Sequence, residues 1–281
     1  MAYERLSGAS LDYLPCRYGK SRLLFRGPRR RLDGCYAAFL GGIETYGRFV
    51  ARPFPALVEE ATGVKCVNFG CAQAGPDVFL NDSELIGAAG GARLAVLQLP
   101  PATNLSNRFY TVHPRRNDRF VEASDLLQTV FRDVDFTEVH FTGHLLARLQ
   151  ATSPERFRMV RDELETAWVV RMKQLIERIG VPTVLLWMQT RPGPASDPGS
   201  GPAEAGAAPA FVTAEMVETL REKAASVVTV CPSEPARADG TRGMVFGPVE
   251  APIAARLPGP AVHRETAVAL APVVSELAGR T

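Results

Sequence analysis

Residues 36–47 read YAAFLGGIETYG, an apolar run that meets two glycines and then a polar turn. This pattern is typical of a buried parallel strand, here expected over residues 36–40, that ends at a functional loop. Glycine at such a strand end allows a positive φ angle and a close approach of the backbone to a ligand. Because ligands of open α/β sheets bind just outside the carboxyl ends of the strands, we expect function first at residues 41–47.

Four more apolar runs have the length of buried strands, and helical patterns separate them. The expected strands are 64–69, 94–99, 183–188 and 226–230, and the expected helices are 55–62, 82–90, 125–132, 135–150, 153–179, 211–225, 248–256 and 263–279. Strands joined by right-handed helical crossovers form a parallel sheet between two helical layers. The sequence therefore predicts a three-layer α/β fold with a five-stranded parallel sheet and a helical insertion, residues 107–150, between strands three and four.

The composition favours one α/β domain with a basic arm. The chain has 281 residues, 46% of them hydrophobic, and a net charge of +2. We expect a basic N-terminal arm (1–34), the α/β domain (35–281) and a flexible loop (191–210) rich in Pro, Gly and Ala. The small net charge favours neither a nucleic-acid nor a membrane partner. Five scattered cysteines, without a CxxC pair or zinc spacing, predict free thiols in the cytoplasm and no metal or other cofactor.

The arm itself has two interpretations. Seven basic residues and no acidic ones lie between Cys16 and Arg31, namely Arg17, Lys20, Arg22, Arg26, Arg29, Arg30 and Arg31. They form either a solvated face packed over the domain or an anion-binding patch for a phosphate- or sulfate-bearing ligand. The tripeptide Gly19-Lys20-Ser21 imitates the end of a P-loop, but Leu14 stands at the place of its first glycine and no buried strand precedes it, which excludes that motif.

The strand-end loops resemble the sequence blocks of the SGNH (GDSL) esterase/lipase superfamily. Gly41-Gly42-Ile43-Glu44-Thr45-Tyr46-Gly47 looks like its first block, GDSxTxG, and Asn68-Phe69-Gly70 with Ala74-Gly75 looks like the second. Asn104 and His263 fall where the third and fifth blocks place an asparagine and a histidine. The likeness covers roughly residues 35–105 and 225–280. It implies a flavodoxin-like fold of the SGNH-hydrolase type, with His263 as base and with Gly75 and Asn104 stabilising an oxyanion. More narrowly, the chain resembles bacterial proteins that carry CRYGxSRLLFRGPRR and VHPRRNDRF.

The departures from this family fall on the chemistry. Ile43 aligns with the nucleophilic serine, Gly42 with the preceding aspartate, and Pro260 with the aspartate three residues before the histidine. Isoleucine has no lone pair with which to attack a carbonyl. A histidine without its carboxylate loses the group that fixes its tautomer and stabilises the imidazolium. A serine esterase of the usual design is therefore not expected.

Other residues near the rim have open roles. Glu44 acts as a base, orients His263, or pairs with nearby arginines. Cys71 is either a thiol nucleophile or an inert buried cysteine. The backbone N–H groups of Gly42 and Gly75, with the Asn104 amide, suit an oxyanion, a carboxylate or a sulfate. We place Gly42 and Ile43 in the same binding site.

The segment after strand three supplies further candidates for ligand binding. Asn107, His113, Arg115 and Arg116 follow that strand on the side of the strand ends, and arginine forks suit carboxylate, phosphate and sulfate. The alternative is a surface lattice of ion pairs with Asp118, Asp133 and Asp135. His140 and His144 lie four residues apart in an expected helix and form either a metal-binding pair or a packed pair; we expect no metal.

Three functions are open from the sequence. The first is an SGNH-like protein that acts on or binds an acylated or anionic small molecule or sugar without a serine nucleophile. The second is a catalytically inactive module that binds an anionic glycan or a protein through its arginines. The third is a transferase in polysaccharide assembly, with the basic arm binding the phosphates of its donor. The oligomeric state is left open.

Overall fold

The computed structural model describes residues 11–189 and 209–279. Its centre is a five-stranded sheet in the order β2-β1-β3-β6-β7, in which all neighbouring strands are parallel. The strands are β1 (Tyr36–Gly41), β2 (Lys65–Gly70), β3 (Leu94–Gln98), β6 (Thr183–Met188) and β7 (Ser226–Val230). This is the flavodoxin-like strand order, and it confirms the predicted three-layer α/β fold with its five-stranded parallel sheet.

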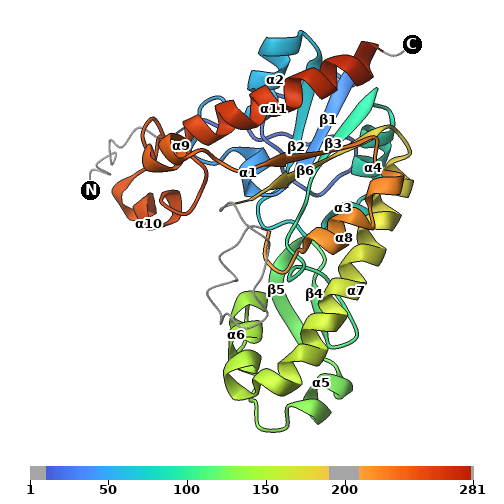
Figure 1. The fold of residues 1–281 in the computed structure, drawn as a ribbon, viewed down its shortest axis with the longest axis vertical. Coiled ribbons are helices and arrows are strands. Elements are labelled where there is room, and N and C mark those ends of the chain that lie inside the picture. Colours follow the sequence, from blue (N-terminus) through green and yellow to red (C-terminus); the bar gives the residue numbers. More distant parts are fainter. Residues whose placement is uncertain (1–10, 190–208, 280–281) are drawn as a thin grey trace, which may run out of the picture.

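The sheet is buried on both faces, because its side chains alternate between two apolar clusters. Ala37 and Phe39 of β1 pack in one cluster with α2 (Phe54–Thr62) and α11 (Pro260–Gly279). Tyr36, Ala38 and Leu40 pack in the other, with α3 (Pro76–Leu80), α4 (Ser83–Gly90), α7 (Pro154–Ile179) and α8 (Ala214–Glu218). Figure 1 shows α2 and α11 together above the sheet, and α4, α7 and α8 on its other side.

Several helix boundaries differ from the expectation. The helix expected over 135–150 begins only at Thr142, as α6 (Thr142–Thr152), and the helix expected over 211–225 is α8 followed by a 3-10 turn, Arg221–Lys223. The last helix starts at Pro260, three residues before the expected start at 263, because proline is well tolerated in the first turn of a helix. Three short elements lie between β7 and α11, namely α9 (Glu234–Ala238), a 3-10 turn Pro248–Glu250, and α10 (Ala251–Ala254).

The insertion after β3 contains a hairpin that we did not expect. Antiparallel strands β4 (Tyr110–His113) and β5 (Arg116–Ala123) precede the helices α5 (Asp125–Val130) and α6. Tyr110, Val112 and Phe120 are buried while Thr111 and Arg119 are exposed, which is the period-2 pattern of a half-buried hairpin. The density of charged residues around the turn Pro114-Arg115 conceals this alternation in the sequence.

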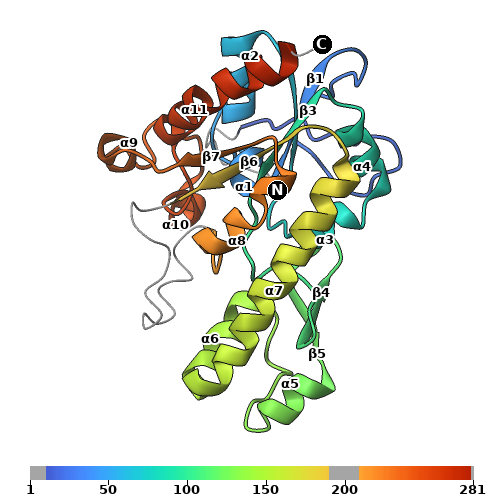
Figure 2. The same cartoon turned by 45° about the vertical axis from the view of Figure 1, so that its right-hand side comes forward.

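The insertion has an apolar cluster of its own, which α7 joins to the main body. Phe157, Val160 and Leu164 of α7 pack with the hairpin, α5 and α6. Trp168 and Met172, further along the same helix, pack against the sheet. Figure 2 shows α7 running from the sheet to the lobe formed by β4, β5, α5 and α6. A single helix of 26 residues therefore fixes the position of the insertion relative to the sheet.

The described part of the N-terminal segment packs against the domain. Tyr18, Leu23 and Phe25 are buried in the cluster that also holds Phe69 of β2, and the Phe25 and Phe69 rings lie 5.3 Å apart. The expected flexible loop 191–210 lies, apart from its last two residues, outside the described ranges. Within residues 11–189 and 209–279, no helix combines the length and the apolar character that a membrane crossing requires.

Candidate functional site

The first glycine turn is closed by Gln98, the last residue of β3. Its Oε1 accepts hydrogen bonds from the N–H of Gly42 at 3.1 Å, the N–H of Thr45 at 3.2 Å and the hydroxyl of Thr45 at 2.5 Å. Its Nε2 donates to Glu44 Oε2 at 2.8 Å. Among the described residues, Glu44 is thus the partner of an amide and of no arginine. The N–H of Gly42, expected to face a ligand, is used within the fold.

The two glycines of this turn permit close packing rather than a positive φ angle. Gly42 has a φ of −83° and caps the one-turn helix α1 (Ile43–Tyr46). A Cβ atom at Gly41 would lie 2.1 Å from Thr45 Oγ1 and 2.5 Å from Gln98 Oε1. The glycine signal in the sequence thus marked a place where side chains approach the backbone, and a left-handed conformation occurs only later, at Gly47, with a φ of 72°.

His263 lies in the first turns of α11, packed against the start of α2. Its Nδ1 accepts a hydrogen bond from the backbone N–H of Phe54 at 3.1 Å, and its ring stacks on the Phe54 ring. The side chain is 1% exposed. Burial, with a smaller contribution from the charge of Arg26, lowers the pKa of His263 to about 4, so the imidazole is neutral at pH 7.

Gly75 lies directly against Asn104, as the expected pairing of second and third loops requires. A Cβ atom on Gly75 would lie 1.5 Å from the backbone oxygen of Asn104, so only glycine fits here. The N–H of Gly75, however, donates to Asn117 Oδ1 at 3.1 Å, and the N–H of Val78 donates to the same oxygen at 2.9 Å. Asn117, a fully buried residue of β5, therefore occupies the donor that the resemblance assigned to an oxyanion.

Asn104 keeps part of its amide available. Its Oδ1 accepts from the hydroxyls of Thr103 at 3.1 Å and Thr142 at 3.0 Å. Among the described residues nothing accepts from its Nδ2. Of the predicted oxyanion donors, the Asn104 amide is the one that the structure leaves open, while those of Gly42 and Gly75 are occupied.

The predicted catalytic groups do not form a hydrogen-bonded set. Within residues 11–189 and 209–279, no hydrogen bond or ion pair links His263 to Glu44 or to Cys71. Burial raises the pKa of the Cys71 thiol to about 12, which holds it in its unreactive protonated form. The inert interpretation of Cys71 is therefore the one that the structure supports.

Most of the polar residues predicted in the insertion shape the hairpin. Asn107 Oδ1 accepts from the N–H groups of Phe109 at 2.8 Å and Tyr110 at 3.2 Å, at the entry to β4. His113 Nδ1 accepts from the N–H of Arg115 at 3.2 Å, at the tip. Arg116 pairs with Asp118 at 3.5 Å, which is one element of the expected ion-pair lattice. Asp133 pairs instead with Arg156.

Arg115 lines a cavity together with four residues of the N-terminal segment. The cavity measures about 430 Å³ and lies between the hairpin tip, the start of α4 and residues 20–23. Lys20, Arg22 and Arg115 line it, and none of these three cations forms an ion pair with a described residue. We call this space the Arg115 cavity. The sequence singled out both basic segments but gave no sign that they meet.

Acidic and amide groups complete the wall of the Arg115 cavity. Asp82 accepts from the Ser21 hydroxyl at 2.6 Å and, as the N-cap of α4, from the N–H of Leu85 at 3.0 Å. Asn81, Ser83 and Glu84 also line the space. The wall thus combines three cations with hydrogen-bonding groups that lie in fixed positions on the first turn of α4.

The two histidines of the insertion do not share a helix. His140 precedes α6, which begins at Thr142, whereas His144 lies within it. In the part of the chain that the structure describes, no group of three or more His, Cys, Asp or Glu side chains is arranged to hold a metal ion.

A sequence family covers almost the whole chain. The model of the family described as "Domain of unknown function (DUF6473)" matches residues 1–278. The chain belongs to the DUF6473 family. No curated protein matches the sequence of this DUF6473 chain.

Two solved structures have a similar course of the backbone. A lipase from a goat rumen metagenome is 13% identical, with a TM-score of 0.43, and the match covers 88% of the DUF6473 chain and 98% of the lipase. A gut microbial diltiazem-metabolizing enzyme is 12% identical, also with a TM-score of 0.43, and the match covers 87% of this chain and 47% of that enzyme. At these values we infer no activity from either protein.

Proposed function

We propose that this protein binds an anionic sugar or glycan in the Arg115 cavity and does not hydrolyse esters by a serine mechanism. The observation that carries the proposal is the meeting of Lys20, Arg22 and Arg115 around a space of about 430 Å³. None of these three cations forms an ion pair within residues 11–189 and 209–279. That volume suits a small-molecule ligand. Guanidinium groups recognise carboxylate, sulfate and phosphate through paired hydrogen bonds.

The remaining lining residues favour a sugar over a bare anion. Asn81, Asp82 and Glu84 present oxygen atoms that accept hydrogen bonds from hydroxyl groups. A sugar acid or a sulfated sugar carries both a negative group for the cations and hydroxyls for these acceptors. A simple inorganic anion has no hydroxyl groups to donate to Asp82 and Glu84, and its negative charge would lie close to these carboxylates.

The strand-end rim supports the non-hydrolytic part of the proposal. Ile43 stands where the SGNH-like pattern places its nucleophile, and the N–H of Gly75 is bonded to Asn117. His263 offers its Nδ1 lone pair to a backbone N–H, which leaves the proton on Nε2, the nitrogen that a general base would need free. We interpret the protein as an SGNH-like domain whose rim groups hold the fold together.

Isothermal titration with a sulfated disaccharide, glucuronic acid and glucose tests this function. We expect the first two to bind the wild-type protein and glucose to bind at least roughly tenfold more weakly, because it lacks the charge-assisted hydrogen bonds. The double variant Arg22→Ala/Arg115→Ala should weaken binding of both anionic sugars by tenfold or more. Arg17→Ala, an exposed arginine of the same segment outside the cavity wall, is the matched control and should bind as the wild type does.

The opposite results would overturn the proposal. Equal affinity for glucose and the anionic sugars would show that the cations do not contribute to binding. Unchanged binding in the double variant, or hydrolysis of an acyl ester that is lost in His263→Gln, would move the function back to the strand-end rim.

A further inference from the structure

A second basic cavity lies at the opposite end of the sheet from the glycine turn. It measures about 390 Å³ and is lined by residues 18–19 and 29–33. Residues 29–33 lead into β1, and Lys65, the first residue of β2, binds to them. The cavity therefore sits at the amino ends of β1 and the edge strand β2, and it shares no lining residue with the Arg115 cavity. We call it the Arg29 cavity.

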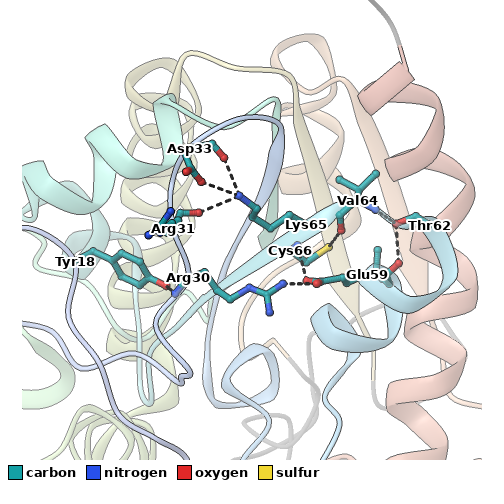
Figure 3. Close-up of polar contacts among 10 residues, drawn as sticks. Tyr18, Arg30, Arg31, Asp33, Glu59, Thr62, Val64, Lys65 and Cys66 are labelled. Atoms are coloured by element: carbon teal, nitrogen blue, oxygen red, sulfur yellow. Dashed lines mark hydrogen bonds and ion pairs between the residues drawn. The ribbon is translucent and has the colours of Figure 1, made fainter.

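The wall of the Arg29 cavity is held in place by its own polar contacts, which Figure 3 shows. The N–H of Arg30 donates to the Tyr18 hydroxyl at 3.0 Å, and the Arg30 side chain pairs with Glu59. Lys65 Nζ donates to the backbone oxygen of Arg31 at 3.3 Å and to that of Asp33 at 2.8 Å. A cationic loop that is fixed before a ligand arrives loses little conformational freedom on binding.

These contacts also engage the acidic groups nearest the cavity. Glu59 pairs with Arg30 through one oxygen and accepts from the N–H of Cys66 at 2.9 Å through the other. Asp33 Oδ1 accepts from Lys65 Nζ at 3.1 Å. Each carboxylate therefore has its own cation, and neither is available to neutralise a further arginine.

Two arginines of the cavity are left without an acidic partner. Arg29 lies with its Cζ atom 6.0 Å from the centroid of the Tyr18 ring, within the range of a cation–π contact that orients the guanidinium. Arg31 is exposed, and among the described residues neither it nor Arg29 forms an ion pair. The cavity thus presents two excess positive charges on a loop that is anchored from both sides.

We infer that the Arg29 cavity binds a tetrahedral oxyanion, in the form of the phosphate or sulfate group of a small molecule. Two guanidinium forks supply several N–H donors to the oxygens of one such group, and Asp33, a carboxylate that also lines the cavity, is already paired with Lys65. This site is independent of the proposed function, because it uses a different cavity and different arginines.

Titration calorimetry with inorganic pyrophosphate, inorganic phosphate and sulfate tests the inference at low ionic strength. We expect pyrophosphate to bind the wild-type protein. The variant Arg29→Ala/Arg31→Ala should bind pyrophosphate with an affinity lower by roughly tenfold or more. Arg17→Ala removes one charge from the same segment outside the cavity, and Arg115→Ala removes one from the other cavity. Both controls should keep the wild-type affinity. Comparison of phosphate with sulfate identifies which oxyanion the site prefers.

The readouts separate this site from the Arg115 cavity and from a general charge effect. Loss confined to the Arg29→Ala/Arg31→Ala variant, with an unchanged circular dichroism spectrum, supports the inference. Failure of all three anions to bind the wild-type protein overturns it, as does equal weakening in Arg17→Ala. Loss of pyrophosphate binding in Arg115→Ala would place the anion in the Arg115 cavity instead. An additional variant, Arg29→Lys/Arg31→Lys, keeps the charge and should restore part of the affinity.

Discussion

The Nδ1 atom of His263 accepts a hydrogen bond from the backbone N–H of Phe54, with 3.1 Å between the two nitrogens. A neutral imidazole has one donor and one acceptor, so the proton lies on Nε2. In a Ser-His-Asp arrangement the proton lies on Nδ1, held by a carboxylate, and the Nε2 lone pair faces the hydroxyl. The structure therefore supports a role for His263 in joining the start of α11 to the start of α2.

This contact makes stability depend on pH. Because burial lowers the pKa of folded His263 to about 4 from its ordinary value of 6.5, the unfolded chain binds the proton more tightly. The stabilisation from the neutral imidazole is fully present above pH 6.5 and is lost as the pH falls toward 4. We expect the free energy of unfolding to fall by on the order of 3 kcal/mol across this window from this residue. Urea denaturation at several pH values measures it.

The variant His263→Gln is the control for that titration. Its amide oxygen can accept from the same N–H but does not titrate, so the fall in stability between pH 6.5 and 4 should be smaller by the contribution of the imidazole. Parallel curves for the two proteins would contradict the assigned pKa.

A serine placed at the position that aligns with the SGNH nucleophile should not create an esterase. Because Nδ1 of His263 accepts from the Phe54 N–H, its Nε2 carries the proton and has no lone pair for the new hydroxyl of Ile43→Ser. The N–H of Gly75, the expected oxyanion donor, is bonded to Asn117. We expect hydrolysis of p-nitrophenyl acetate by Ile43→Ser to equal that of the wild type. Activity in Ile43→Ser that disappears in Ile43→Ser/His263→Gln would show that the rim can assemble a working base.

The contact between the second and third loops should not tolerate a methyl group. In Gly75→Ala the new Cβ would meet the backbone oxygen of Asn104, which cannot move like a flexible side chain. We expect a loss of about 3 kcal/mol or more in the free energy of unfolding, as for severe overpacking. The matched control is Gly87→Ala, in α4, where nothing lies within 4 Å of the new atom. It should be neutral or stabilising by up to about 1 kcal/mol.

Asn117 should contribute to stability through the two N–H groups that it accepts. Asn117→Ala leaves the buried donors of Gly75 and Val78 without a partner, at about 1–3 kcal/mol for each group. Thermal and urea unfolding measure the loss. Asn81→Ala, at an exposed position without a side-chain hydrogen bond among the described residues, should change stability by less than about 0.5 kcal/mol. Similar losses in both variants would contradict the role given to Asn117.

Strands β1, β3 and β6 of the main sheet were predictable because they are buried on both faces. Runs such as 36–40 and 184–188 are continuously apolar, and Gly41 or Pro182 lies close to an end of each. The hairpin β4–β5 was missed, since only one of its faces is buried and its turn is dense in charge. The start of α6 was misplaced because His140 and His144 have helical spacing although His140 lies in the preceding loop.

The contact between the second and third loops was predictable from the sequence, but the hydrogen bonds of their N–H groups were not. Gly75 and Asn104 are neighbours, as the order of the loops indicated. The N–H of Gly42 donates to Gln98, which lies 56 positions further along the chain. The N–H of Gly75 donates to Asn117, which lies 42 positions further along. The sequence has no local signal for tertiary contacts of this kind. The meeting of Lys20 and Arg22 with Arg115 is likewise a product of the fold rather than of a motif.

A crystal structure of the protein with a bound sulfated disaccharide tests the central claim most directly. We expect the sulfate group within hydrogen-bonding distance of Arg115 and of Lys20 or Arg22, the sugar hydroxyls facing Asp82 or Glu84, and His263 still bonded to the Phe54 N–H. A disaccharide seated instead at the strand-end rim, against the Asn104 amide and with the His263 ring turned away from Phe54, would contradict it.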